Sequence, residues 1–296
     1  MIFKAKPFIK WVGGKTQLLG EIDKQIMSLL SDNKDYTYIE PFVGGGAVLF
    51  WILQKYPNIK RAIINDLNHD LINTYKIVKD NPKELIESLS DIQNKYLSLQ
   101  ENDRKSFFLE QRALFNTDSQ DSLQRATLFI FLNKTCFNGL YRVNSKGKFN
   151  VPFGKYKNPR ILDEQTILSD SAVLQKVEIL NMDFAETLCY AHRNTLFYCD
   201  PPYRPLSETS SFNSYTKEAF NDDEQIRLRD FCNQIDKKGY KYILSNSDPK
   251  GKDMDDNFFD KLYEKHHIQR VLATRMINSD ADKRGALTEL LISNIY

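Results

Sequence analysis

The tetrapeptide Asp200-Pro201-Pro202-Tyr203 follows a short apolar run, Thr195 to Cys199, and places three kinds of chemical group at fixed spacing. Each proline fixes its φ angle and removes a backbone N–H, so the carbonyls here project at fixed angles. A carboxylate, a rigid carbonyl and an aromatic face together suit one task, which is to hold a planar amino group by both N–H bonds while stacking on its ring. The simpler alternative is a proline-rich turn with a surface carboxylate.

An aromatic amine is a poor nucleophile because its lone pair is delocalised into the ring. Acceptors outside the ring plane, here the Asp200 carboxylate and the Pro201 carbonyl, would draw the amino hydrogens toward tetrahedral geometry. The freed lone pair could then attack a methyl sulfonium, with Asp200 as acceptor and proton relay. A base inside a duplex cannot reach such a pocket, so we expect it to be flipped out and stacked on Tyr203.

A second group of residues indicates a nucleotide-like cofactor. The segment from Glu40 to Gly46 reads EPFVGGG and lies between a predicted strand and a predicted helix, where glycines let a ligand approach the backbone and the helix N-terminus. Asp66 ends the next strand, where a carboxylate accepts hydrogen bonds from ribose hydroxyls, although it could instead cap a helix. Asp183 and Phe184 follow the third strand and are placed to meet an adenine ring. Together these residues indicate NAD or S-adenosylmethionine.

The residues Gly14-Lys15-Thr16 end a phosphate-binding P-loop pattern, but the rest of the pattern is missing. The position that requires the first glycine is Ile9, and Trp11 would crowd a bound phosphate. A different role must explain this Gly-Lys pair.

Residues 134–160 carry a concentration of positive charge and aromatic rings. The segment has no acidic residue, and its seven basic residues are Lys134, Arg142, Lys146, Lys148, Lys155, Lys157 and Arg160. Its five aromatic residues are Phe137, Tyr141, Phe149, Phe153 and Tyr156. Cations neutralise phosphates while rings stack on bases or wedge between them, so this composition favours a nucleic-acid surface over a solvated basic loop.

The elements that must position these groups alternate along the chain. Seven apolar, β-branched runs predict strands at 36–42, 61–67, 177–184, 195–202, 240–246, 268–274 and 288–296. Helical patterns at 47–56 and 222–239 lie between strands, which predicts an α/β fold with a doubly wound, mostly parallel, Rossmann-like sheet. The alternation stops between about 70 and 165, where three helical segments precede a hairpin-like run at 141–151 with a Ser-Lys-Gly turn. We interpret this region as an inserted, mainly helical module.

Composition narrows the class of protein. A chain of 296 residues with 41% hydrophobic content can bury a proper core, and it has neither an apolar run long enough to span a membrane nor a signal peptide. We therefore expect a cytoplasmic enzyme without a membrane partner. Its four cysteines are far apart and its four histidines have no ligand spacing, so we expect neither a disulfide framework nor a metal site.

The blocks FIKWVGGKTQLL, YIEPFVGGGAVLF, INDLNHDLINTY, NGLYRVNSKGKFNVPFGKYKNP, NMDF and YCDPPYRPLSETSSFNSYT resemble the Dam-type DNA adenine-N6 methyltransferases, the D12 class in its α arrangement. The similarity covers nearly the whole chain, in the order cofactor motif, recognition insert and catalytic DPPY. It implies S-adenosylmethionine as cofactor, double-stranded DNA as partner, a monomer, and GATC as the recognised site. It also implies a discontinuous catalytic domain (1–74 and 166–296) around a target-recognition domain (75–165).

The resemblance also implies roles for individual residues. The catalytic motif is Asp200, Pro201, Pro202 and Tyr203. The implied cofactor-binding residues are Trp11, Gly14, Lys15, Glu40, Pro41, Phe42, Gly44, Gly46, Asp66, Asp183, Phe184 and Asp200, with Lys15 on the cofactor's carboxylate. The implied DNA-binding residues are Lys134, Phe137, Asn138, Gly139, Leu140, Arg142, Asn144, Lys146, Lys148 and Pro152. Among these, Arg142 is the candidate for a bidentate contact to guanine, and Phe137, Leu140 and Pro152 occupy positions that contact or wedge bases.

Several alternatives have sequence features that argue against them. Methyltransferases of RNA or of protein glutamine more often have Asn where this chain has Asp200, and they lack a basic hairpin. Cytosine-N4 enzymes usually have Ser at that position. A DNA-binding module that has lost catalysis would be expected to break the DPPY or glycine motif, and both are intact.

Overall fold

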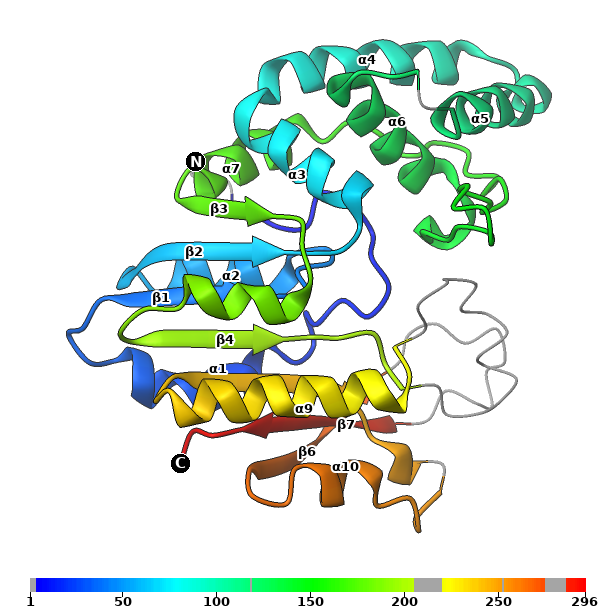
Figure 1. Cartoon of the computed structure of the whole chain (residues 1–296). Helices are drawn as coiled ribbons and strands as arrows, with labels where there is room; N and C mark the ends of the chain where they lie inside the picture. Colours follow the sequence, from blue (N-terminus) through cyan, green and yellow to red (C-terminus); the bar gives the residue numbers. More distant parts are fainter. Residues whose placement is uncertain (1–3, 118, 205–219, 252, 275–285) are drawn as a thin grey trace.

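The computed structural model describes residues 4–117, 119–204, 220–251, 253–274 and 286–296 (Figure 1). A seven-stranded sheet has the order β3-β2-β1-β4-β5-β7-β6. Its strands are β1 (Tyr36–Glu40), β2 (Ile59–Asn65), β3 (Val177–Leu180), β4 (Thr195–Cys199), β5 (Lys241–Ser247), β6 (His267–Thr274) and β7 (Ala286–Ser293). The first five strands in that order are mutually parallel, and β7 pairs antiparallel with both β5 and β6. The predicted α/β class and mostly parallel sheet are confirmed.

All seven predicted strands are present, and five of them end two to four residues earlier than predicted; for β4 and β3 the cause is local. β4 ends at Cys199 rather than at residue 202, because Pro201 and Pro202 cannot donate to a ladder. β3 ends at Leu180 rather than at Phe184, because Asp183 begins a 3-10 helix, η2 (Phe184–Tyr190), with a reciprocal capping box.

Helices cover both faces of the sheet. On one face, α1 (Leu19–Leu30) and α2 (Ala47–Lys55) belong to the larger buried cluster, which takes Tyr38 from β1. On the other face, η2, α9 (Asp222–Lys237) and α10 (Phe258–Leu262) form a second cluster, which takes the neighbouring Ile39. Successive strand residues point to opposite faces, so each central strand is buried on both sides.

The inserted helices lie together beyond the β3 edge of the sheet (Figure 1). They are α3 (His69–Asp80), α4 (Pro82–Ser98), α5 (Glu101–Phe115), α6 (Ser122–Thr135) and α7 (Glu164–Leu174). Four of the α-helices in the described ranges, α1, α5, α7 and α10, are not among the segments named as helical from the sequence. α6 is buried on nearly all sides because it packs against α3, α4 and α5 at once.

The predicted hairpin at 141–151 is present as a tight turn without extended strands. Val143 and Phe149 form one isolated antiparallel bridge, and the Gly147 amide donates to the Asn144 carbonyl. Two backbone hydrogen bonds flank this bridge, from the Asn144 amide to the Lys148 carbonyl and from the Asn150 amide to the Arg142 carbonyl, and Pro152 has no N–H with which to continue the ladder. The amide and carbonyl of Phe149 face the other way and bond the Asn116 side chain, at 2.7 and 3.0 Å.

Candidate active site

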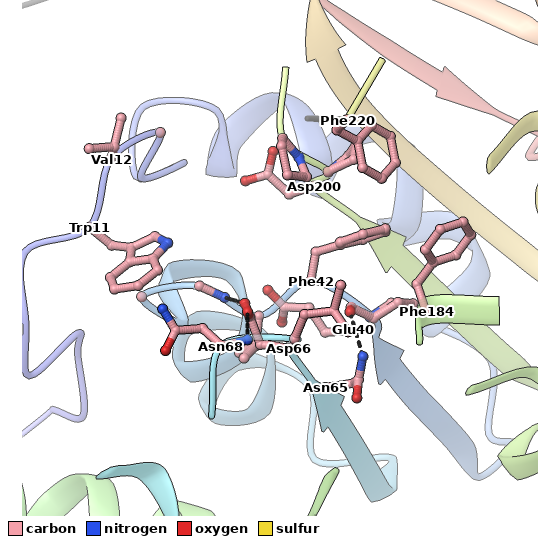
Figure 2. A pocket seen from close by; sticks show the side chains of 18 of the residues that line it. Trp11, Val12, Glu40, Phe42, Asn65, Asp66, Asn68, Phe184, Asp200 and Phe220 are labelled. Atoms are coloured by element: carbon pink, nitrogen blue, oxygen red, sulfur yellow. Dashed lines mark hydrogen bonds between the residues drawn. The ribbon is translucent and has the colours of Figure 1, made fainter. Parts of the chain in front are cut away.

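A cavity of about 1720 Å³ opens at the carboxyl ends of β1, β2 and β4. The neighbours of β1 in the sheet are β2 and β4, so the chain reverses direction across the sheet at this point, where open α/β sheets bind their ligands. Every residue predicted for catalysis or for cofactor binding lines this one cavity. Figure 2 shows Trp11 at one end and Phe42, Phe184 and Phe220 at the other, with Asp66 and Asp200 between them.

Asp200 is held at the end of β4 by two donors to the same carboxylate oxygen. Lys15 Nζ lies 2.9 Å from Asp200 Oδ1, and the Ser245 hydroxyl donates to that oxygen at 3.0 Å. Oδ2 has no hydrogen-bond partner among the described residues. Burial raises the pKa of Asp200, while the charge and hydrogen bond of Lys15 oppose this effect. The carboxylate is therefore fixed on one side and open on the other.

Lys15 accounts for the Gly-Lys pair that resembles a P-loop. Its side chain is only 4% exposed, and its ammonium donates to the Gly13 carbonyl at 2.6 Å as well as pairing with Asp200. The same ammonium lies 4.7 Å from the centroid of the Tyr203 ring. In this structure the buried cation therefore connects the N-terminal segment to the Asp-Pro-Pro-Tyr segment at 200–203. Its implied contact with a cofactor carboxylate stays a prediction.

The glycine-rich turn carries an aromatic side chain rather than open space. A Cβ at Gly44 would lie 2.8 Å from Trp11 Cδ1, and one at Gly45 would lie 2.9 Å from Trp11 Cβ. Gly46 adopts φ 74°, and a Cβ there would lie 2.5 Å from the Tyr75 hydroxyl. Side chains at these positions would collide, so glycine is required for Trp11 to cover the turn and for α2 to start there.

Asp66 supports the glycine turn instead of capping a helix. Its carboxylate accepts from the Gly44 amide at 3.1 Å and from the Asn68 amide at 2.9 Å. The N-cap of α3 is Asn68, whose side chain accepts from the Leu71 amide, so the capping alternative for Asp66 is wrong. Burial raises the pKa of Asp66, and these two hydrogen bonds lower it.

Two further polar residues hold the ends of β1 and β2. Glu40 is buried and accepts from the Tyr38 hydroxyl at 2.7 Å, and burial raises its pKa well above the usual range. Asn65 donates to the Pro41 and Met182 carbonyls and accepts from the Met182 amide (Figure 2). Asn65 thus ties together the loops that follow β1 and β3. Sequence reasoning missed it, although its place at the end of a predicted strand is a usable signal.

Asp183 and Phe184 share a cation. Arg227 of α9 forms two 2.8 Å hydrogen bonds to the Asp183 carboxylate, and its guanidinium lies 4.1 Å from the centroid of the Phe184 ring. The pKa of Asp183 is lowered mainly by this arginine. Phe42 packs against Phe184, with ring centroids 5.2 Å apart, and Phe220 lies 5.9 Å from Phe42. Neither Arg227 nor Phe220 was predicted from the sequence.

The predicted DNA-binding residues lie on the turn and on the adjoining end of α6. Arg142 is exposed, and its Nε donates to Asn150 Oδ1 at 2.8 Å. Asn144 organises the turn by accepting from the Lys146 and Lys148 amides. Burial, followed by the nearby charge of Lys10, lowers the pKa of Lys134 to about 8.

The remaining predicted positions form a short loop after α6. Asn138 and Gly139 both have positive φ, at 56° and 65°, and Gly139 packs against the Lys10 side chain. The Phe137 amide donates to the Pro152 carbonyl, and Leu140 is partly buried against the larger core cluster.

Most of the five aromatic residues of 134–160 pack against the protein, so the composition overstated how many rings are free to stack on bases. Phe137 is 52% exposed, whereas Phe149 is only 4% exposed and Phe153 packs against Phe108 of α5. Tyr141 stacks on Trp11, with centroids 5.7 Å apart, and donates to Asp70 Oδ2. Phe149 is buried, and Tyr141 and Phe153 are partly buried, because the turn folds back onto α5, α6 and the N-terminal segment.

Within the described residues, no group of three or more His, Cys, Asp or Glu side chains could hold a metal ion. Likewise, none of the helices in the described ranges is long and apolar enough to cross a membrane.

Comparison with known proteins agrees with this geometry. The model of the D12 class N6 adenine-specific DNA methyltransferases matches residues 11–277. The chain is 51% identical to the type II methyltransferase M.MjaIII of Methanocaldococcus jannaschii, over 98% of this chain and 99% of that protein. It is 40% identical to the type II methyltransferase M1.LlaDCHI of Lactococcus lactis, over 98% of this chain and 95% of that protein. It is 35% identical to a DNA adenine methylase of Haemophilus influenzae, over 97% and 93%.

Members of this class use S-adenosylmethionine as methyl donor, which resolves the choice between that cofactor and NAD. The chain belongs to the D12 class of N6 adenine-specific DNA methyltransferases.

Proposed function

We propose that this enzyme methylates the adenine of GATC after flipping it out of the duplex, with Asp200 as the acceptor that orients the target amino group. The observation that carries this proposal is the state of the Asp200 carboxylate. Lys15 and Ser245 hold Oδ1, Oδ2 has no partner among the described residues, and Asp200 lines the cavity. A fixed acceptor needs no reorganisation when the amine arrives, which is how electrostatic catalysis gains its advantage.

The cavity fits a bound S-adenosylmethionine together with a base. Its volume of about 1720 Å³ exceeds the roughly 300–1,000 Å³ that is typical of small-ligand pockets. Asp66 and Asp183 supply carboxylates for hydroxyl and amino groups, and Phe42 supplies an aromatic face. When bound, the cofactor supplies the electrophilic methyl group. The protein's part is to hold the amine with Asp200 and the Pro201 carbonyl, to stack the base on Tyr203, and to take up the released proton at Asp200.

Site recognition is proposed for the 75–165 region, with 1–74 and 166–296 as the catalytic domain. Arg142 is exposed on the turn and bonds only to Asn150 among the described residues, so its guanidinium is available to exchange that partner for a guanine edge. The inserted helices pack on one another and place this turn beside the cavity, which Val143 and Gly147 also line. We further propose a monomeric, cytoplasmic enzyme, since its partner is DNA.

The decisive experiment is transfer of radiolabelled methyl groups from S-adenosylmethionine to two duplexes. The duplexes differ only in whether the adenine of a single GATC is already N6-methylated on both strands. Label in the unmethylated duplex alone is the expected result. Label in both would refute GATC as the only methylated site, and label in neither would refute GATC as a site of this enzyme. An Asp200→Ala variant should lose transfer while binding DNA within a few fold of the wild type.

A further inference from the structure

Tyr203 is hydrogen-bonded to a residue that lies far from it in the sequence. Its hydroxyl donates to Glu289 Oε2 at 2.8 Å. Glu289 belongs to β7 and pairs in register with Ser247 of β5. Among the described residues, this hydroxyl is the only hydrogen-bond partner of the Glu289 carboxylate, and no cation there pairs with it. A half-buried carboxylate with a single tyrosine as partner is suited to hold that ring in place.

One face of the Tyr203 ring is covered by a cation. The Lys15 ammonium lies 4.7 Å from the ring centroid and so covers one side of Tyr203. A base can therefore stack only on the other side. Because the Lys15 ammonium also binds Asp200 at 2.9 Å, the stacking plane and the acceptor carboxylate are fixed relative to each other. A tyrosine released from Glu289 could rotate about its side-chain bonds and lose this relation.

We propose that Glu289 is a positioning residue for methyl transfer: by accepting the hydrogen bond of the Tyr203 hydroxyl, it fixes the plane on which the flipped adenine stacks. This inference rests on the proposed base flipping. On this proposal the antiparallel strand β7 contributes to a site whose other residues follow parallel strands.

The test compares Glu289→Ala, Glu289→Gln, Tyr203→Phe and the Tyr203→Phe/Glu289→Ala double variant. Three quantities are measured: the single-turnover rate of methyl transfer to a GATC duplex, the Kd for that duplex, and the emission of 2-aminopurine placed at the target adenine. Loss of a hydrogen bond to a charged group predicts that Glu289→Ala slows transfer by about tenfold to a hundredfold. The Kd should change little, and the emission of the flipped base should rise because stacking on Tyr203 is loosened.

Glu289→Gln keeps an acceptor oxygen and should stay within a few fold of the wild type. In the Tyr203→Phe background, Glu289→Ala should have no further effect, because the interaction is already absent. Glu178→Ala is the matched control, since Glu178 lies on β3 and bonds Arg61, away from the cavity.

An equal loss of rate from Glu289→Ala in both backgrounds would overturn the inference, as would unchanged emission and rate in the single variant. If the wild-type enzyme itself gives no emission change with 2-aminopurine, base flipping fails and the inference fails with it. The two failures are thus told apart by the wild-type measurement.

Discussion

Replacing Lys15 with Met should move the acid limb of the methyl-transfer rate to higher pH. In the proposed mechanism Asp200 must be ionised to accept from the target amine, so the rate falls as pH falls through the pKa of Asp200. That pKa is already raised by burial and by the negative charge of Glu289, and Lys15 is the main group that opposes the rise. Removing the cation raises the pKa further, and protonation then begins at a higher pH.

The size of the effect follows from the geometry. Two unit charges 2.9 Å apart interact by about 6 kcal/mol at an effective dielectric constant of about 20. Asp200 is 21% exposed, so solvent screens part of this energy. Neighbouring opposite charges typically move a carboxyl pKa by about 1 to 3 units. We therefore expect the midpoint of the acid limb to rise by about one to three pH units.

The assay is single-turnover transfer to a GATC duplex from pH 5 to pH 9, roughly the range in which such a limb falls, with S-adenosylmethionine at saturation so that weaker cofactor binding does not contribute. Lys15→Arg is the control because it keeps the charge. A uniform fall in rate with an unmoved acid limb would refute the reasoning and would leave Lys15 as a cofactor ligand alone.

Three further changes test other parts of the structure. Gly44→Ala should lower the free energy of unfolding by about 1 to 3 kcal/mol, since its Cβ would meet Trp11 and its φ is 49°; denaturant unfolding beside Gly20→Ala, where nothing lies within 4 Å, checks this. Burial raises the pKa of Asp170 to about 8, so between about pH 4 and pH 8 the native state binds a proton that the unfolded state does not. The free energy of unfolding therefore falls as pH rises through this range. Asp170→Asn should flatten that slope in unfolding experiments at different pH, and an unchanged slope would contradict the reasoning. Arg142→Ala should lose about 1 to 3 kcal/mol of discrimination at one guanine, measured by competition between GATC and single-base variants; unchanged preference would remove Arg142 from base reading.

The part of the site that the sequence predicts consists of residues at strand ends. Asp66, Asp183 and Asp200 each follow a strand-like run, and parallel strands bring their carboxyl ends to one edge, so their meeting in one cavity follows from local pattern alone. Asn65 also ends a strand, but its role could not be predicted from that position, because a polar residue at a strand end can have many roles.

Contacts between segments that are distant in the sequence could not be predicted from local sequence patterns. The pairing of Lys15 with Asp200, and of Glu289 with Tyr203, depends on how the N-terminal segment and β7 pack against β4. Helix α5 was missed because its buried side is small, while most of its other residues are charged or polar. Phe149 was grouped with base-stacking rings because the sequence does not show which residues the turn packs against, and this packing decides which rings are exposed.

Trp11 contacts both the glycine turn, which is proposed to bind the cofactor, and the 141–151 turn, which is proposed to bind DNA. Its ring covers Gly44 and Gly45 and stacks on Tyr141, which bonds Asp70 at the start of α3, while Arg125 of α6 bonds the same carboxylate. A ligand that shifts the glycine turn must therefore move a side chain on which Tyr141, at the start of the 141–151 turn, is stacked. Coupling free energy between two binding equilibria is reciprocal, so whatever factor S-adenosylmethionine imposes on DNA affinity through this indole, DNA imposes on the affinity for S-adenosylmethionine.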